Sequence, residues 1–138
     1  MRLYDIKGRL VSHNSLPYLI DWKKPSRSKL QFRVKQFLKT YWGSHVVFEE
    51  FPVYGSQMKV DILNATTKVA IEVNGQQHGK FIPFFHGKHP INFLKSIKRD
   101  SGKREWLESN GYILVDIEYN EVDDLNADFF KRKYDIIL

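Results

Sequence analysis

Cysteine is absent from this chain of 138 residues. Without thiols, a disulfide-stabilised scaffold and a thiolate metal site are both excluded, and the absence fits a reducing cytoplasm. Long apolar runs are missing too, since none approaches the ~20 residues that a membrane-spanning helix needs. The first residues also lack the apolar segment of a signal peptide. We therefore expect a cytoplasmic protein without a membrane partner.

Acidic residues are fewer than basic ones, 16 against 22, which gives a formal net charge of +6. Hydrophobic residues make up 42% and aromatics 14%, a globular composition rather than a disordered one. A basic balance favours a polyanionic partner such as nucleic acid, although many proteins carry such a charge for solubility alone. The distribution of the charges is therefore more informative than their sum.

No repeat and no linker divides the chain, so we expect one α/β domain over residues 26–138. Residues 1–25 form an irregular segment packed on it, with a hairpin near Gly8 and a turn at Pro17. Ser28 and Gln31 have capping-box spacing before the first helix. Periodicity and turn residues predict helices at 29–41, 90–109 and 127–134, and strands at 46–51, 58–63, 68–74 and 112–118. This order predicts an α/β sandwich with a central mixed sheet of about four strands flanked by helices.

The outer face of the first predicted helix is wholly cationic, with Arg33, Lys35 and Lys39 and no acidic residue. Lys24 and Arg27 precede it in a loop. We interpret these cations as a phosphate-facing surface, with an ordinary solvated surface as the alternative.

The second and third predicted strands carry the residues that suggest chemistry. If Leu63 pairs with Lys68 across the turn, Lys59 lies opposite Glu72, and Asp61 lies diagonal to Glu72. The alternation then predicts one buried apolar face, formed by Met58, Val60, Ile62, Val69, Ile71 and Val73. The other face carries Lys59, Asp61, Ala70, Glu72 and Asn74.

Asp61 and Glu72 are close enough in this register for their carboxylates to converge on one cation. Carboxylates suit a hard divalent ion such as Mg²⁺, with Mn²⁺ as a substitute. That ion can neutralise charge on a phosphodiester and lower the pKa of an attacking water, while Lys59 stabilises the transition state or orients the water. The alternative is a cross-strand ion pair on a solvated face.

Further polar and basic residues follow the third strand. Gln76 and His78 come directly after its end, and His78 could act as a general acid or base or in the metal shell. A zinc site is a competing explanation, but the histidine spacing matches no standard ligand pattern. The loop and helix that follow add cations that we assign to nucleic-acid binding, namely Lys80, Lys95, Lys98, Arg99 and Lys103.

In this order, the residues resemble the PD-(D/E)XK nuclease superfamily, and within it very-short-patch-repair-like endonucleases and their small phage and bacterial relatives. The resemblance covers roughly residues 26–118. Its motifs are Lys59-Val60-Asp61, Ile71-Glu72-Val73-Asn74-Gly75-Gln76-Gln77-His78, Arg99-Asp100-x-x-Lys103-Arg104-x-x-Leu107 and Gly111-Tyr112-x-Leu114.

The resemblance implies that Asp61 is the principal metal ligand, Glu72 the second acid and His78 a histidine that assists hydrolysis. Asn74 stands where the superfamily usually has its catalytic lysine. Lys59, Gln76 or His78 must then take that role, or the metal alone suffices. Gln31 stands where the first helix often supplies a glutamate, and Glu50 is our candidate for a replacement metal ligand.

We therefore expect a Mg²⁺-dependent endonuclease that hydrolyses DNA in the cytoplasm of a bacterial or phage-infected cell, with a homodimer as one arrangement. The alternative is a nuclease fold that has lost its chemistry and only binds DNA or RNA. A third class, a small-molecule hydrolase, leaves the basic charge unexplained. Mismatch nicking, junction resolution, homing and general degradation all stay open.

Overall fold

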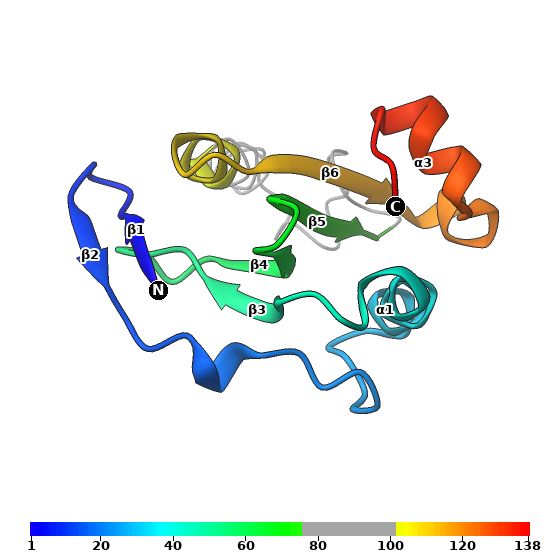
Figure 1. The fold of residues 1–138 in the computed structure, drawn as a ribbon, viewed down its shortest axis with the longest axis horizontal. Helices are drawn as coiled ribbons and strands as arrows, with labels where there is room; N and C mark the ends of the chain where they lie inside the picture. Colours follow the sequence, from blue (N-terminus) through cyan, green and yellow to red (C-terminus); the bar gives the residue numbers. More distant parts are fainter. Residues whose placement is uncertain (76–101) are drawn as a thin grey trace, which may run out of the picture.

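The computed structural model describes residues 1–75 and 102–138, and these form a mixed α/β structure around a four-stranded sheet (Figure 1). In order across the sheet, the strands are β3 (Val47–Pro52), β4 (Lys59–Asn64), β5 (Val69–Asn74) and β6 (Ile113–Glu118). The β3–β4 and β4–β5 pairs are antiparallel, and the β5–β6 pair is parallel. The predicted class and all four strands are confirmed.

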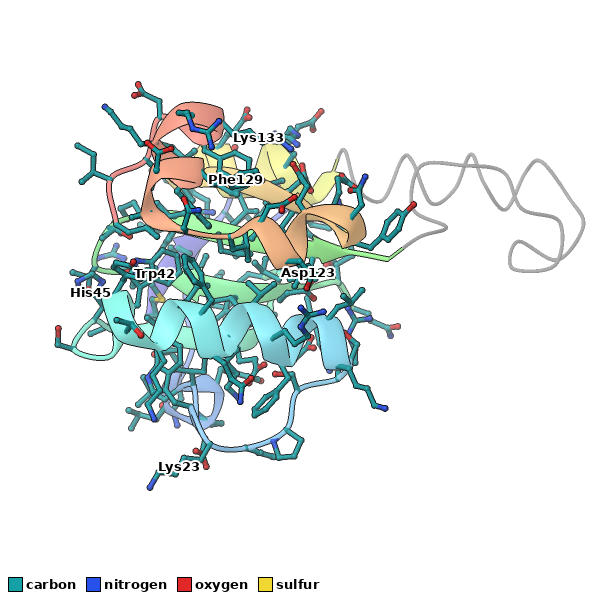
Figure 2. All side chains as sticks on the ribbon, turned by 90° about the vertical axis from the view of Figure 1, so that its right-hand side faces the viewer. Lys23, Trp42, His45, Asp123, Phe129 and Lys133 are labelled. Atoms are coloured by element: carbon teal, nitrogen blue, oxygen red, sulfur yellow. The ribbon has the colours of Figure 1, made fainter. Side chains whose placement is uncertain are left out.

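Helices lie on both faces of the sheet. One face is covered by α1 (Lys29–Trp42) and α3 (Ala127–Tyr134), as Figures 1 and 2 show. The other is covered by the helical residues 102–109 and by the hairpin of β1 (Arg2–Tyr4) and β2 (Leu10–Ser12). The first and last predicted helices are confirmed, whereas most of the predicted helix 90–109 lies outside the described residues.

Two hydrophobic clusters fill the spaces between these layers. The cluster under α1 and α3 includes Val34, Leu38, Trp42, Ile62, Ile71 and Phe130. The cluster on the opposite face includes Phe51, Val60, Leu63, Ala70, Trp106 and Leu107. The face of β4 and β5 that was predicted to carry Lys59, Asp61, Ala70, Glu72 and Asn74 is therefore polar only at one end. Ala70, at its other end, is buried in the second cluster.

The N-terminal segment contains the two features that the sequence predicts. The β1–β2 hairpin has Gly8 in its connection, at a φ of 83° that favours glycine. A 3₁₀ turn, η1 (Leu16–Tyr18), follows and contains Pro17. The segment packs on the sheet layer, since Leu3 is buried and the Trp106 indole N–H donates to the Tyr4 carbonyl at 2.6 Å.

The predicted cationic outer face of the first helix is wrong at Lys35, whereas Arg33 and Lys39 are exposed as expected. Ser28 does cap it, accepting a hydrogen bond from the Gln31 backbone N–H at 3.1 Å, and Gly43 ends it as expected. The residues that it buries are Gln31, Val34, Lys35, Leu38 and Trp42, which recur at helical spacing and so form one stripe. Lys35 therefore faces the sheet and not a phosphate-binding surface.

The register of β4 against β5 differs by two residues from the expected one. Lys68 has a φ of 62° and belongs to the turn, so it cannot pair with Leu63. Asn64 pairs with Val69 instead, and its side chain accepts hydrogen bonds from two backbone N–H groups of the turn at 2.9 Å. The shift brings Asp61 beside Glu72.

The predicted apolar face is only partly confirmed: Ile62, Val69 and Ile71 pack in the cluster under α1 and α3. Met58 and Val60 pack in the cluster on the opposite face instead.

A second 3₁₀ turn, η2 (Tyr119–Asp124), links β6 to α3, and the sequence analysis missed it. Among residues 1–75 and 102–138, no helix is both long enough and apolar enough to cross a membrane.

Candidate functional site

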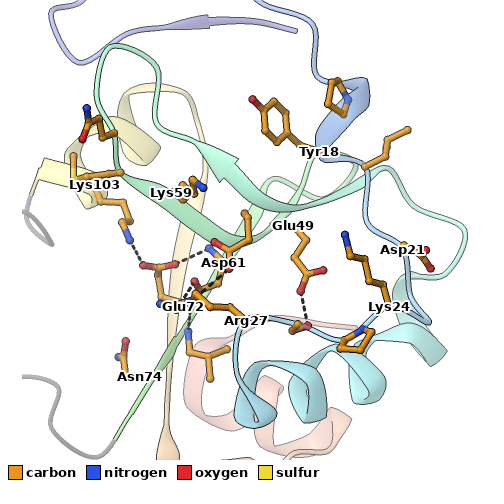
Figure 3. A pocket seen from close by; sticks show the side chains of 18 of the residues that line it. Tyr18, Asp21, Lys24, Arg27, Glu49, Lys59, Asp61, Glu72, Asn74 and Lys103 are labelled. Carbon is orange, nitrogen blue, oxygen red and sulfur yellow. Dashed lines mark hydrogen bonds and ion pairs between the residues drawn. The ribbon is translucent and has the colours of Figure 1, made fainter.

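Acidic residues from three neighbouring strands meet at one end of the sheet. Glu49 and Glu50 come from β3, Asp61 from β4 and Glu72 from β5, and all four line an open cleft of about 1040 Å³ (Figure 3). The N-terminal segment, including Tyr18, forms another part of its lining. Glu50, Asp61 and Glu72 were predicted from the sequence as site residues, whereas Glu49 was not.

The carboxylates of Asp61 and Glu72 each accept a hydrogen bond from the backbone of the neighbouring strand. The Asp61 N–H donates to Glu72 Oε2 at 2.8 Å, and the Val73 N–H donates to Asp61 Oδ2 at 2.8 Å. These carboxylates take the place of strand carbonyls, and the regular β4–β5 pairing ends at Ile62 and Ile71. The two acids are therefore held side by side by the sheet itself, and their geometry does not depend on a flexible loop.

Burial makes this acid pair costly to ionise. Desolvation, followed by repulsion from Glu72, raises the pKa of Asp61 from 3.8 to about 6. Desolvation also raises the pKa of Glu72, while Lys103 opposes the rise. Only 5% of Asp61 is exposed. Two buried carboxylates with raised pKa values form a site that a cation stabilises, and such sites cluster at functional centres.

Lys103 forms an ion pair with Glu72, and both side chains are largely buried. The sequence analysis assigned Lys103 to a nucleic-acid-binding surface, but the structure places it in the cleft instead. No local pattern could have shown this, because the contact depends on how the helical residues 102–109 lie across β5. Their approach brings a lysine to the second acid of the pair.

Arg27 lies over the other acid of the pair. Its Nη2 is 3.2 Å from Asp61 Oδ1, and its Nε is 3.3 Å from Glu50 Oε1. Glu50 is thus connected to Asp61 through a guanidinium group rather than by a direct approach of the carboxylates. Like Lys103, Arg27 was expected to contact phosphate from an outer surface and is instead part of the cleft.

Glu49 belongs to a hydrogen-bonded network beneath α1 in which both of its carboxylate oxygens have partners. Its Oε1 accepts from the Lys35 ammonium at 2.8 Å, and its Oε2 accepts from Ser26 Oγ at 2.6 Å and Gln31 Nε2 at 3.0 Å. Lys35 also donates to the Lys24 carbonyl at 2.8 Å. Its assignment to nucleic-acid binding is therefore wrong, because its side chain is completely buried and already paired.

Asn74 and Lys59 do not contribute to the acid pair as expected. Asn74 Nδ2 donates to Glu118 Oε1 at 3.0 Å, across the parallel pairing with β6. Lys59 pairs with Pro52 on β3 and lines the cleft as an exposed residue. The predicted pairing of Lys59 with Glu72 is wrong, because the register shift puts Asp61 in that place.

The other predicted contacts with nucleic acid are only partly visible. Arg33 is exposed and forms an ion pair with Asp123 of η2. Lys24 is exposed at the rim of the cleft. The remaining predicted site residues lie outside the described ranges, and these are Gln76, His78, Lys80, Lys95, Lys98 and Arg99.

Asp61 and Glu72 fit a Mg²⁺ site that has only two protein carboxylates. Within residues 1–75 and 102–138, no group of three histidine, aspartate or glutamate side chains is arranged to hold a metal ion. Mg²⁺ is often bound by only one or two carboxylates, with water and substrate phosphate completing its shell. The donor set and the open cleft therefore suit an ion that binds together with a phosphate.

No protein-family model matches the chain, and no solved structure matches it. Similar proteins are found in viruses. Uncharacterized protein 033L of Invertebrate iridescent virus 3 is 26% identical over 115 residues, which cover 79% of this chain and 59% of that protein. Uncharacterized protein 307L of Invertebrate iridescent virus 6 is 35% identical over 66 residues, or 48% of this chain and 33% of that protein.

A third relative, Uncharacterized protein 094L of Frog virus 3 (isolate Goorha), is 29% identical over 72 residues, which cover 52% of this chain and 46% of that protein. The chain therefore spans between a third and three fifths of the length of these relatives. None of their names states an activity, so the function has to be argued from the site.

Proposed function

We propose that this protein is a metal-dependent nuclease with a restriction-endonuclease-like fold, which hydrolyses phosphodiester bonds of DNA. One observation carries the proposal: Asp61 and Glu72 lie side by side, buried at the edge of an open cleft, with raised pKa values and a lysine on one of them. The resemblance to PD-(D/E)XK nucleases supports it, because these are the two acids of that motif.

Asp61 and Glu72 would hold the Mg²⁺ ion, with the oxygens now paired to Arg27 and Lys103 turned toward it. When bound, Mg²⁺ supplies positive charge to the scissile phosphate and lowers the pKa of an attacking water. The chain's own contribution is position, since the Val73 N–H fixes the Asp61 carboxylate and the Asp61 N–H fixes that of Glu72.

Lys103 is our candidate for the catalytic lysine that is missing from the strand. Its ammonium contacts Glu72 Oε1 although it comes from a different element. A lysine held there can orient the attacking water or stabilise negative charge on the phosphate. In this proposal Lys103 takes the catalytic role that the sequence interpretation offered to Lys59, because Lys103 contacts Glu72. Asn74 has a structural role, as a hydrogen-bond partner of Glu118 on β6.

A second candidate function is favoured by one feature of the cleft. Arg27 and Lys103 already neutralise the acid pair within the protein. A nuclease fold that binds nucleic acid without cutting it would have this arrangement. We rank it second because buried acids with raised pKa values lower the stability of the folded protein, and binding of nucleic acid without metal does not use them.

The test is to incubate the purified protein with duplex, single-stranded and branched DNA and with RNA, in Mg²⁺, Mn²⁺ or EDTA. We expect cleavage of at least one DNA substrate, loss of cleavage in EDTA, and a loss of about a thousandfold or more in Asp61→Asn, because a metal ligand is removed. Circular dichroism and salt-dependent DNA binding of the variant should stay close to wild type.

Cleavage by Asp61→Asn at the wild-type rate would contradict the mechanism. Salt-sensitive binding of nucleic acid without cleavage of any substrate would favour the second function. The homodimer and the cytoplasmic location stay predictions, and the viral relatives favour a virus-infected cell as the setting.

A further inference from the structure

Of the two described cations that contact Asp61 or Glu72, Arg27 is the one that lies largely in solvent. Its side chain is 65% exposed, whereas that of Lys103 is 14% exposed. The guanidinium reaches down to Asp61 with one nitrogen and to Glu50 with another (Figure 3). It therefore covers the solvent side of Asp61, where an ion entering from the cleft must approach.

The backbone on each side of Arg27 is anchored. Ser26 Oγ donates to Glu49 Oε2 at 2.6 Å, and Ser28 caps α1 by accepting from the Gln31 N–H. The loop therefore holds its position while the long Arg27 side chain can rotate away. A displaced guanidinium would stay at the mouth of the cleft and would not be carried off with the loop.

The energies favour exchange at Arg27 rather than at Lys103. Most of the Arg27 side chain already lies in water, so little new hydration is needed when its guanidinium leaves Asp61. The contact of Lys103 with Glu72 is shielded from water, so breaking it costs more. A divalent ion carries twice the charge of the guanidinium and suits the buried Asp61 carboxylate better.

We propose that Arg27 is the exchangeable counter-cation of this site: it holds Asp61 and Glu50 in the metal-free protein and yields Asp61 to a divalent cation. The released guanidinium then faces the cleft, where its planar fork suits a phosphate of the bound nucleic acid. This inference rests on the proposed function for the identity of the polyanion. The exchange itself concerns only the metal and the acids.

The experiment measures binding of Mg²⁺ and of Mn²⁺ to the metal-free full chain by isothermal titration calorimetry. We expect Arg27→Ala to bind metal roughly three- to tenfold more tightly than wild type, because a competing cation of modest strength is removed. Arg27→Lys should lie between the two, since a lysine keeps the charge but cannot reach both carboxylates.

Arg132→Ala is the matched control. Arg132 is 67% exposed and pairs with Asp128 at 2.7 Å on α3, so its replacement removes a similar ion pair elsewhere and should leave metal affinity unchanged. A fluorescein-labelled DNA oligonucleotide gives the second readout. Arg27→Ala should weaken its binding several-fold in Mg²⁺ and much less in EDTA.

Unchanged or weaker metal binding by Arg27→Ala would overturn the exchange, even if the wild-type protein cuts DNA. Tighter binding without cleavage of any substrate would support the exchange while the nuclease proposal fails. An equal loss of oligonucleotide binding with and without metal would overturn the release of the guanidinium. No heat of metal binding in any of the proteins would overturn the exchange, while Mg²⁺-dependent cleavage of DNA would still support the nuclease, whose ion can bind together with a substrate phosphate.

Discussion

Within residues 1–75 and 102–138, two largely buried lysine–glutamate pairs differ in the surroundings of the acid. Glu49 receives Lys35, Ser26 and Gln31, so both of its oxygens have partners beneath α1. Glu72 receives Lys103 and the Asp61 N–H, but it stands beside a second buried carboxylate. Glu49 has the Lys35 ammonium to itself, whereas Glu72 and its neighbour Asp61 depend on two separate cations, Lys103 and Arg27, at the wall of a cleft.

This difference separates a structural pair from a functional one. A buried ion pair that is fully hydrogen-bonded holds two elements in one arrangement, here α1 against β3. A buried pair of carboxylates raises its own pKa values and so destabilises the folded protein unless a cation is added. We therefore assign scaffolding to the Lys35–Glu49 pair and chemistry to the Asp61–Glu72 pair.

The largest expected effect breaks the Lys35–Glu49 pair. Replacing Lys35 by Met should lower the free energy of unfolding by about 3–5 kcal/mol, because Glu49 is left charged and buried without its cation. Lys103→Met should cost less than half as much, since Glu72 has a raised pKa and can become protonated. Urea denaturation in EDTA measures both, with the exposed Lys39→Met on the same helix as a control. Equal losses for the two lysines would contradict the comparison.

The next effect is the pH dependence of the Asp61–Glu72 pair. Because the folded-state pKa of Asp61, about 6, lies above its ordinary value of 3.8, folded protein retains a proton that the unfolded chain releases. This contribution to stability is fully present below pH 3.8 and is lost as the pH rises through about 6. Relative to Asp61→Asn, the wild-type protein should therefore lose roughly 2–3 kcal/mol over that range.

Thermal or urea unfolding of both proteins in EDTA, across this pH range, measures that difference. Metal should reverse the trend, because Mg²⁺ requires the ionised carboxylate and so binds more tightly as the pH rises. A stability difference that stays constant with pH would show that Asp61 is not the strained acid.

The smallest of these effects removes one partner from the Lys35–Glu49 pair. Ser26→Ala deletes the hydrogen bond of 2.6 Å to Glu49 and should lower the free energy of unfolding by about 1–2 kcal/mol, as expected for a bond to a charged group. Ser44→Ala, at an exposed position after α1, should change it by less than about 0.5 kcal/mol. If Ser26→Ala is silent, water replaces the hydroxyl and the pair is less shielded than its contacts suggest.

Local patterns predicted the elements of the fold well. The strands were predicted to within one residue at each described end, and Ser28 and Gly43 marked the ends of α1 as expected. Errors arose where two elements meet. The register missed by two because Lys68 adopts a left-handed conformation, which residue type alone does not indicate.

The cations show the same limit more clearly. Lys35, Arg27 and Lys103 were all predicted to face nucleic acid, because a charged residue is most often exposed. One signal for Lys35 was in the sequence: it lies four residues after Gln31 and one after Val34, on the stripe that α1 buries. For Arg27 and Lys103 there was no such signal, since their acids lie 34 and 31 residues away along the chain.

By itself, then, the sequence determined the α/β class, the strands and the choice of Asp61 and Glu72, because hydrophobic alternation and turn residues act over a few neighbours. Only the tertiary structure decided which cations stand on those acids and which acid, Glu49, is already satisfied. The physical reason is that charge pairing depends on distances between elements, whereas the pattern of a strand depends on its own residues. Asp61 and Glu72 could be chosen from their own strands, whereas the charges around them come from other elements that only the folded chain brings near.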